Sequence, residues 1–128
     1  MIEMCKRGDI YFTDLGAVTG CCQCGVRPVI IVSNDTANEH SPTITVVPLT
    51  SQMKKRNQPT HVVLGHREAT GLSKPSMVLC EQVRSLDKTA LGNCVGRIVS
   101  RDAMNRITRG LQVQIGAVDS NRCKVKLT

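Results

Sequence analysis

The sequence predicts a mainly β fold, a small antiparallel barrel or sandwich, followed by an α-helix near the C-terminus. Short runs rich in β-branched residues recur along the chain, with turn residues between them and no helical pattern separating them. This spacing is typical of antiparallel sheets rather than of alternating β-α units. Beyond residue 100 the apolar residues recur every three or four positions, which indicates a helix.

Each expected strand ends where turn residues begin. The second one is an unbroken apolar run closed by Ser33-Asn34, typical of a strand buried on both faces. Pro48 lies late in the third, where a residue without an N–H suits an edge or a bulge. The expected strands span residues 9–12, 26–32, 43–49, 61–64, 77–83 and 94–99.

The expected helix begins at Ser100, which can cap it, and Asp102 falls in the first turn, where the helix dipole favours a negative charge. Gly110 lowers its intrinsic stability by about 1 kcal/mol relative to alanine, so packing must hold it. One apolar stripe predicts that the helix covers the sheet as a lid: Met104, Ile107, Leu111, Ile115 and Val118.

Chain length limits the number of domains, and net charge indicates the kind of binding partner. With 128 residues, we expect a single domain over 1–128, in which the basic stretch 119–128 is a fraying tail. A formal net charge of +7 suits a polyanion such as nucleic acid. Because Tyr11 and Phe12 are the only aromatic residues apart from histidine, a bound RNA would be held mainly through phosphates and base edges.

The chain carries no signal for a membrane or for secretion. No run approaches the ~20 apolar residues that span a bilayer, and residues 1–7 lack the apolar segment of a signal peptide. We therefore expect a cytoplasmic protein without membrane contact. An odd number of cysteines, seven, in a reducing compartment then favours thiols over a disulfide framework.

Arg27 stands at the mouth of the second strand. It cannot readily enter the core, because it keeps its charge and needs hydrogen-bond partners. It would either anchor a structural pair or face a site that handles anions. Three polar loops, 16–25, 34–42 and 50–59, are expected to meet at the same rim.

The third of these loops carries groups suited to phosphates and base edges. Hydroxyl and amide side chains come first, at Thr50, Ser51 and Gln52, and the basic run Lys54-Lys55-Arg56 follows. A basic run of this kind also occurs simply as a solvated face.

Several stretches together resemble the MazF/PemK-type toxin endoribonucleases of type II toxin–antitoxin systems. Residues 6–15 (KRGDIYFTDL) and 25–35 (GVRPVIIVSND) are similar to the opening and second strand of that family. Shorter matches follow in order at 41–43, 48–52, 59–62 and 81–88, so that the resemblance extends over about residues 6–118.

The resemblance implies an SH3-like barrel with a C-terminal helix, usually a homodimer, that cleaves single-stranded RNA without a metal or other cofactor. It also implies an antitoxin whose acidic, partly disordered segment covers the RNA groove, and with which the toxin binds DNA. Arg27 and Thr50 match the family's catalytic pair. We expect RNA contacts from matching positions and from the adjacent basic run, namely Gln23, Ser51, Gln52, Lys54, Glu81 and Gln82.

The side chains of Arg27 and Thr50 are chemically suited to these roles. When the ribose 2′-hydroxyl is the nucleophile, the protein must stabilise charge on the phosphate and assist two proton transfers. A guanidinium offers a bidentate fork to the phosphate oxygens, and a hydroxyl can donate to the same group. Because arginine keeps its proton, the general base and acid stay unassigned. His40 and His61 are candidates because histidine is the usual proton-transfer residue near neutral pH, but structural hydrogen bonds are the simpler interpretation for both.

One loop departs from the family pattern. Where relatives commonly have Gly-Ser-Glu-Gln-x-Gly, this chain has Gly20-Cys21-Cys22-Gln23-Cys24-Gly25, which removes the usual serine and acid. Cys21 and Cys24 have the spacing of a metal or redox pair, yet no second Cys or His pair lies at a convincing distance. Inert or mildly reactive loop thiols are the expected interpretation. The other cysteines are expected to act as small apolar residues or exposed tail thiols: Cys5, Cys80, Cys94 and Cys123.

Some alternatives remain open. Glu81 and Arg84 also fit a structural role, in which they pair with each other or with Asp87 and Lys88. The chain could be a toxin of related fold that inhibits a protein such as gyrase through its C-terminal helix. It could also be a catalytically inactive RNA-binding regulator, as the altered cysteine loop suggests.

Overall fold

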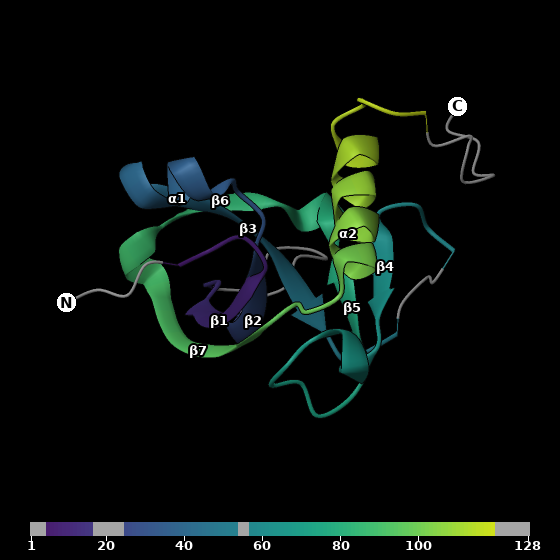
Figure 1. Ribbon diagram of the computed structural model, residues 1–128, viewed down its shortest axis with the longest axis horizontal. Helices are drawn as coiled ribbons and strands as arrows, with labels where there is room; N and C mark the ends of the chain where they lie inside the picture. The colour runs from purple at the N-terminus through teal and green to yellow at the C-terminus, as the bar shows by residue number, and fades with distance from the viewer. Residues whose placement is uncertain (1–4, 17–24, 54–56, 120–128) are drawn as a thin grey trace.

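The computed structural model describes residues 5–16, 25–53 and 57–119 (Figure 1). Within these ranges the strands are β1 (Asp9–Asp14), β2 (Val26–Ile31), β3 (Thr43–Thr50), β4 (His61–Leu64), β5 (Ser76–Leu79), β6 (Arg84–Asp87) and β7 (Leu91–Arg97). The helices are α1 (Asp35–His40) and α2 (Arg101–Gln114). Three short 3-10 turns join the later strands: η1 (His66–Glu68), η2 (Cys80–Gln82) and η3 (Lys88–Ala90).

The strands form one antiparallel sheet in the order β4-β5-β3-β2-β1-β7, with β6 also paired to β3. The mainly β fold with a C-terminal helix is therefore confirmed. The sheet curls without closing into a complete barrel. In the described part of the chain, its two ends are bridged by a single residue pair outside the strands, Ala69 and Ile98.

Of the two positions that suit Pro48, an edge or a bulge, the edge is wrong, because β3 is a central strand. One side of β3 pairs with β2. On the other side, the residues up to Val46 pair with β6, and those from Leu49 onward pair with β5. Pro48 falls between these two partners, where that ladder is interrupted. A residue that cannot donate a hydrogen bond is tolerated at such a break.

Alternate residues of β2 are buried in two different hydrophobic clusters. Ile30 joins the cluster between the sheet and α2, together with Ile107 of that helix. Val29 and Ile31 join the cluster on the other face. This confirms a strand buried on both faces and explains its unbroken apolar run. Each such side chain contributes about 1.5–3 kcal/mol through burial.

Helix α2 begins as expected and ends earlier than expected. The Ser100 hydroxyl accepts a hydrogen bond from the Ala103 N–H at 3.1 Å. At the other end Gly116 has a φ of +77°, and its N–H and that of Ala117 bond back to Val113 and Gln112. These are the paired bonds of a glycine C-cap. Ile115 is consequently 74% exposed and Val118 lies beyond the helix, so the stripe is wrong at both positions.

Two further elements differ from the sequence expectation. Residues 77–83 are not one strand, because β5 ends at Leu79 and the chain turns through η2 before β6. The last strand begins at Leu91 and ends at Arg97, which shifts it toward the N-terminus from the expected 94–99.

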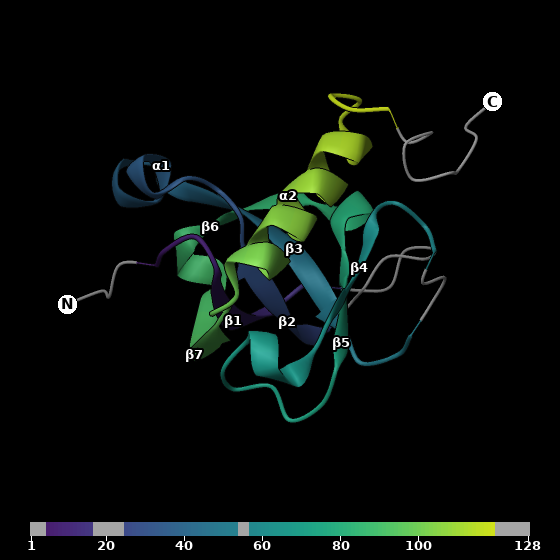
Figure 2. The same ribbon diagram turned by 45° about the vertical axis from the view of Figure 1, so that its right-hand side comes forward.

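The connection 34–42 contains α1, which was expected to be loop. Asn34 caps this helix by accepting a hydrogen bond from the Ala37 N–H at 2.9 Å. The 34–42 connection also lies at the opposite end of the sheet from the other two loops. Successive connections of an antiparallel sheet alternate between its two ends, and 34–42 is the middle one of the three. Figures 1 and 2 show α1 far from the end of β3 and from β4. The meeting of three loops at one rim is therefore wrong for this one.

Candidate functional site

A cavity of about 220 Å³ lies where β2 begins and β3 ends. Arg27 and Thr50 both line it, together with Ser51. The last paired residues of the two strands are Val29 and Pro48. Two residues further, the same register places Arg27 opposite Thr50. Neighbouring strands thus bring together two residues that are far apart in the sequence.

The two side chains differ in their surroundings. Arg27 is exposed, and it is paired with Thr13 in the β1–β2 ladder. Thr50 is only 6% exposed, and its hydroxyl oxygen accepts a hydrogen bond from the Gln52 N–H at 3.1 Å. A hydroxyl that accepts one hydrogen bond still has a proton to donate. The arrangement therefore offers a positive charge and a fixed donor to an anion in the cavity.

Glu81 and Gln82 do not line this cavity; both lie in η2, after β5. Glu81 Oε2 is 2.7 Å from His61 Nε2, and the side chain of His61 is 5% exposed. Within the described residues, the other carboxylate oxygen of Glu81 is buried without a hydrogen-bond partner. The structural interpretation of His61 agrees with this contact, and an RNA contact by Glu81 or Gln82 stays a prediction.

The structural role left open for Glu81 and Arg84 agrees with their contacts, but the partners differ from those expected. The Arg84 guanidinium donates to the Leu15 carbonyl at 3.4 Å rather than to a carboxylate. Asp87 accepts hydrogen bonds from the backbone and hydroxyl of Thr89, and these bonds lower the pKa of its carboxyl group.

Gln23 and Lys54 lie outside the described residues, as do Cys21, Cys22, Cys24 and Cys123. Among the described cysteines, Cys5 and Cys80 are buried, as expected of small apolar residues. Burial, and secondarily the charge of Glu81, raises the pKa of the Cys80 thiol to about 12. Cys94 is exposed on β7, so the apolar interpretation is wrong there.

Sequence reasoning missed several residues that line the cavity. Ser73 and Lys74 line it from the connection between η1 and β5, and the exposed ring of Phe12 lines it from β1. In the sequence, the stretch around Lys74 is an ordinary turn with glycine and proline. Only the distant contacts of the folded chain bring it to Arg27.

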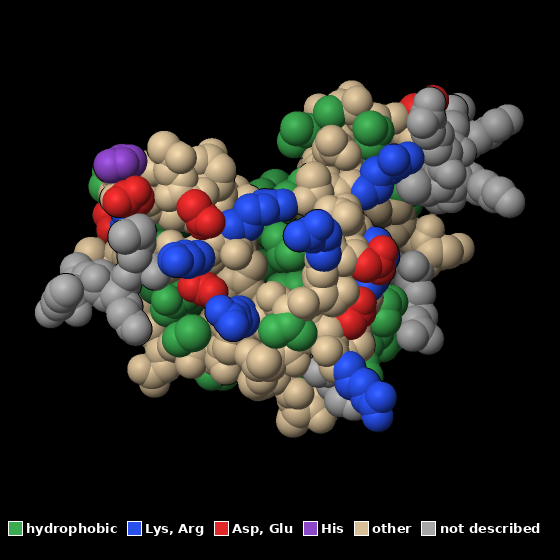
Figure 3. All heavy atoms as spheres, in the orientation of Figure 1, with side chains coloured by type: hydrophobic (Ala, Val, Ile, Leu, Met, Phe, Trp, Pro, Cys, Tyr) green, Lys and Arg blue, Asp and Glu red, His purple; other side chains and the backbone are tan. Residues whose placement is uncertain are grey.

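The described residues of the face that carries α2 form no continuous basic patch (Figure 3). On this face, Lys and Arg side chains are interspersed with Asp and Glu side chains (Figure 3). Mixed charges of this kind do not produce the single-sign field that concentrates a polyanion. Neither helix of the described part is long and apolar enough to cross a membrane.

Comparison with known proteins places this geometry in a family. Residues 6–115 match the PemK-like, MazF-like toxins of type II toxin–antitoxin systems. The chain belongs to this family. The resemblance seen in the sequence is thereby confirmed over nearly the same residues.

Similarity to individual proteins agrees with this family match. The chain is 38% identical over 114 residues to endoribonuclease EndoA of Bacillus subtilis strain 168, covering 89% of this chain and 97% of that protein. A solved mycobacterial endoribonuclease is 27% identical, with a TM-score of 0.71 over 90% of this chain and 94% of its own. A second, solved in complex with its cognate antitoxin, is 29% identical, with a TM-score of 0.68 over 90% and 96%.

Proposed function

We propose that this endoribonuclease toxin cleaves single-stranded RNA, including mRNA, at particular short sequences and without a metal ion. The products would carry a 2′,3′-cyclic phosphate and a 5′-hydroxyl, and loss of mRNA would stop translation and growth. Membership of the PemK-like and MazF-like toxins supports this proposal, as does the 38% identity to an endoribonuclease. The observation that carries it is the cavity that Arg27 and Thr50 line together.

The proposed reaction needs little covalent chemistry from the protein. The ribose 2′-oxygen attacks the adjacent phosphorus, the bond from phosphorus to the 5′-oxygen breaks, and one proton leaves the 2′-hydroxyl while another reaches the 5′-oxygen. Arg27 would bind the phosphate oxygens through two parallel N–H groups as their negative charge increases. The Thr50 hydroxyl would donate to the same phosphate. The groups that move the two protons stay unassigned.

Partners follow from the family and from the charge of the chain. Among the relatives, one mycobacterial endoribonuclease was solved with its cognate antitoxin. We propose that this chain also binds a cognate antitoxin, and that an acidic, partly disordered segment of it covers the cavity. We also propose a homodimer as the functional unit.

The test is cleavage of a mixed RNA pool in EDTA, with the ends mapped and their chemistry determined. Arg27→Ala and Thr50→Ala should each lower kcat by about 10²–10³-fold, the usual effect of removing one preorganised donor. Thr50→Ser is the matched control, because it keeps the hydroxyl and should retain most activity. Arg101→Ala removes an equal charge from an exposed position outside the cavity and should cleave like the wild type.

Three results would overturn parts of this proposal. Cleavage that EDTA abolishes would exclude the metal-free reaction. Wild-type rates in Arg27→Ala or Thr50→Ala would exclude the assigned site. Tight RNA binding without products would instead favour an inactive RNA-binding regulator.

A further inference from the structure

The connection between η1 and β5 is held tightly against β7. A Cβ on Gly71 would lie 2.0 Å from the Val95 carbonyl oxygen, and one on Gly96 would lie 2.1 Å from the Thr70 carbonyl oxygen. Real side chains do not approach backbone atoms this closely. Glycine at both positions therefore allows two backbone segments to touch, one from each side of the contact.

Hydrogen bonds fix the same contact. The Thr70 N–H donates to the Arg97 carbonyl at 2.8 Å, and the Arg97 N–H donates to the Thr70 hydroxyl at 2.9 Å. Leu72 then packs against the hydrophobic cluster beneath α2. In Figures 1 and 2 this connection passes below the sheet, on the side away from α1. A loop with this many attachments presents its side chains in a defined place.

The residues that follow this anchor face the proposed active site. Ser73 and Lys74 line the same cavity as Arg27 and Thr50. Lys74 comes from the η1–β5 connection and Arg27 from β2, so the two positive charges reach the cavity from separate parts of the fold. Both residues are exposed.

We propose that Lys74 is a positioning residue that binds an RNA phosphate next to the one that is cleaved. This inference rests on the proposed function of the cavity. Successive phosphates are a regular feature of any RNA strand, so a strand held by Arg27 at one phosphate presents another nearby. Arg27 is a planar fork suited to the reacting phosphate, whereas Lys74 is a compact charge on a flexible stem, suited to a phosphate that need only be held.

A positioning role predicts a specific kinetic effect. The contact with the phosphate exists both before and during the reaction. Its loss therefore weakens the binding of the substrate and of the transition state by the same amount, which raises KM and leaves kcat nearly unchanged. We expect Lys74→Gln to raise KM about 5- to 10-fold. For single-stranded nucleic acid, each lost phosphate contact should also lower the slope of log Kd against log salt by about 0.7.

The experiment measures both quantities on the folded full-length chain. KM and kcat are measured with a short RNA that contains the mapped cleavage sequence. Kd is measured between about 50 and 200 mM salt with the same oligonucleotide carrying one 2′-deoxy nucleotide at the cleavage position, which removes the nucleophile. Lys74→Arg should restore wild-type values. Lys6→Gln is the matched control, because Lys6 is exposed and does not line the cavity.

Two outcomes would overturn the proposal. A KM and salt slope for Lys74→Gln equal to those of Lys6→Gln would show that Lys74 acts only through net charge. A large fall in kcat at unchanged KM would assign it to the transition state. Failure of the proposed function looks different, since a wild-type chain that cleaves no RNA gives no KM and no cleavage sequence, while the salt slopes of wild type, Lys74→Gln and Lys6→Gln can still be compared on a mixed single-stranded RNA pool.

Discussion

Gly110 lies where α2 passes closest to the buried thiol of Cys80. A Cβ at this position would be 2.8 Å from Cys80 Sγ and 3.3 Å from its Cβ. By helix propensity alone, Gly110→Ala should stabilise the protein by about 1 kcal/mol. Because the core around it has no room, we expect a net destabilisation of about 1–3 kcal/mol instead, measured as the free energy of unfolding in urea.

A second variant separates the clash from any other effect of the glycine. Cys80→Ala removes the sulfur that the new methyl group would meet. In that background Gly110→Ala should cost much less, or even stabilise the helix. An equal loss in both backgrounds would show that the contact with Cys80 is not what requires glycine.

Cys80 in η2 and Cys94 on β7 should differ in their reactivity toward alkylating reagents. Burial raises the pKa of the Cys80 thiol to about 12, so almost none of it is thiolate at neutral pH. Cys94 is exposed. Brief treatment with iodoacetamide at pH 7.5, followed by peptide mapping, should therefore modify Cys94 and leave Cys80 unmodified until urea is added. Rapid modification of Cys80 in the native protein would contradict its burial.

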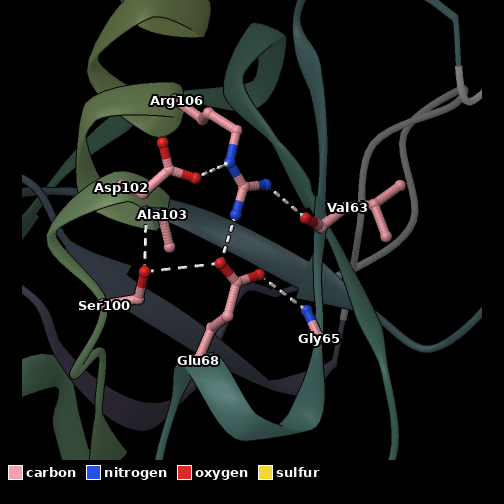
Figure 4. Close-up of polar contacts among 7 residues, drawn as sticks. All are labelled: Val63, Gly65, Glu68, Ser100, Asp102, Ala103 and Arg106. Atoms are coloured by element: carbon pink, nitrogen blue, oxygen red, sulfur yellow. Dashed lines mark hydrogen bonds and ion pairs between the residues drawn. The ribbon is translucent and has the colours of Figure 1, made fainter.

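At the scale of elements, a polar network holds the first half of α2 against β4 and η1 (Figure 4). Arg106 donates to Glu68, to Asp102 at 2.9 Å and to the Val63 carbonyl at 2.7 Å. The Gly65 N–H donates to Glu68 Oε1 at 3.1 Å, and the Ser100 hydroxyl donates to Oε2 at 3.4 Å. Glu68 therefore joins the helix to the strand side of the molecule.

We expect Glu68→Gln to destabilise the protein by about 1–2 kcal/mol at pH 7, a value discounted because both partners are partly exposed. The hydrogen bond from Arg106 is the largest cause that lowers the pKa of Glu68 in the folded protein. Its stabilisation is therefore complete above the ordinary carboxyl pKa and is lost as pH falls through the lowered value. In urea titrations, the difference between wild type and variant should be constant above about pH 6 and shrink below about pH 4.

Asp102→Asn provides the matched control for this network. Its carboxylate also contacts Arg106, but it lies on the exposed side of the helix, where such pairs contribute little. We expect less than about 0.5 kcal/mol from this change. A Glu68→Gln variant with no greater effect, or with no change at acid pH, would show that the network does not fasten the helix.

The boundaries of the elements show where sequence patterns succeed and where they fail. The start of α2 followed from Ser100, because an N-cap is a local signal. Its end was missed although Gly116 was visible, since the apolar residues at 115 and 118 continued the stripe. The Gly116 turn stopped the helix before them. Apolar periodicity alone therefore predicts too long a helix when a glycine C-cap ends the helix within the periodic stretch.

At the scale of the whole molecule, one half of the candidate site was predictable and the other was not. The resemblance pointed to Arg27 and Thr50, and an antiparallel register then brings them together. Lys74 could not be found in this way. Its place depends on the close approach of Gly71 to Val95 and of Gly96 to Thr70. A single glycine in a turn does not predict which distant backbone segment it will contact.

The C-terminal stretch offers a test of the single domain over residues 1–128. The family match ends at residue 115, and the stretch beyond residue 119 is short, polar and basic in sequence. We therefore expect a chain ending at Asp119 to unfold at the same urea concentration as the full chain and to cleave RNA with the same kcat. Because Arg122, Lys124 and Lys126 would be lost, its salt slope for RNA binding should fall by up to about 2.

A full-length variant with these three residues changed to glutamine tests the cause. If the tail acts only through its charge, this variant should bind RNA like the shortened chain and unfold like the wild type. A shortened chain that unfolds at clearly lower urea, while the glutamine variant does not, would mean that the last residues pack on the domain. In that case they belong to the folded unit rather than to a tail.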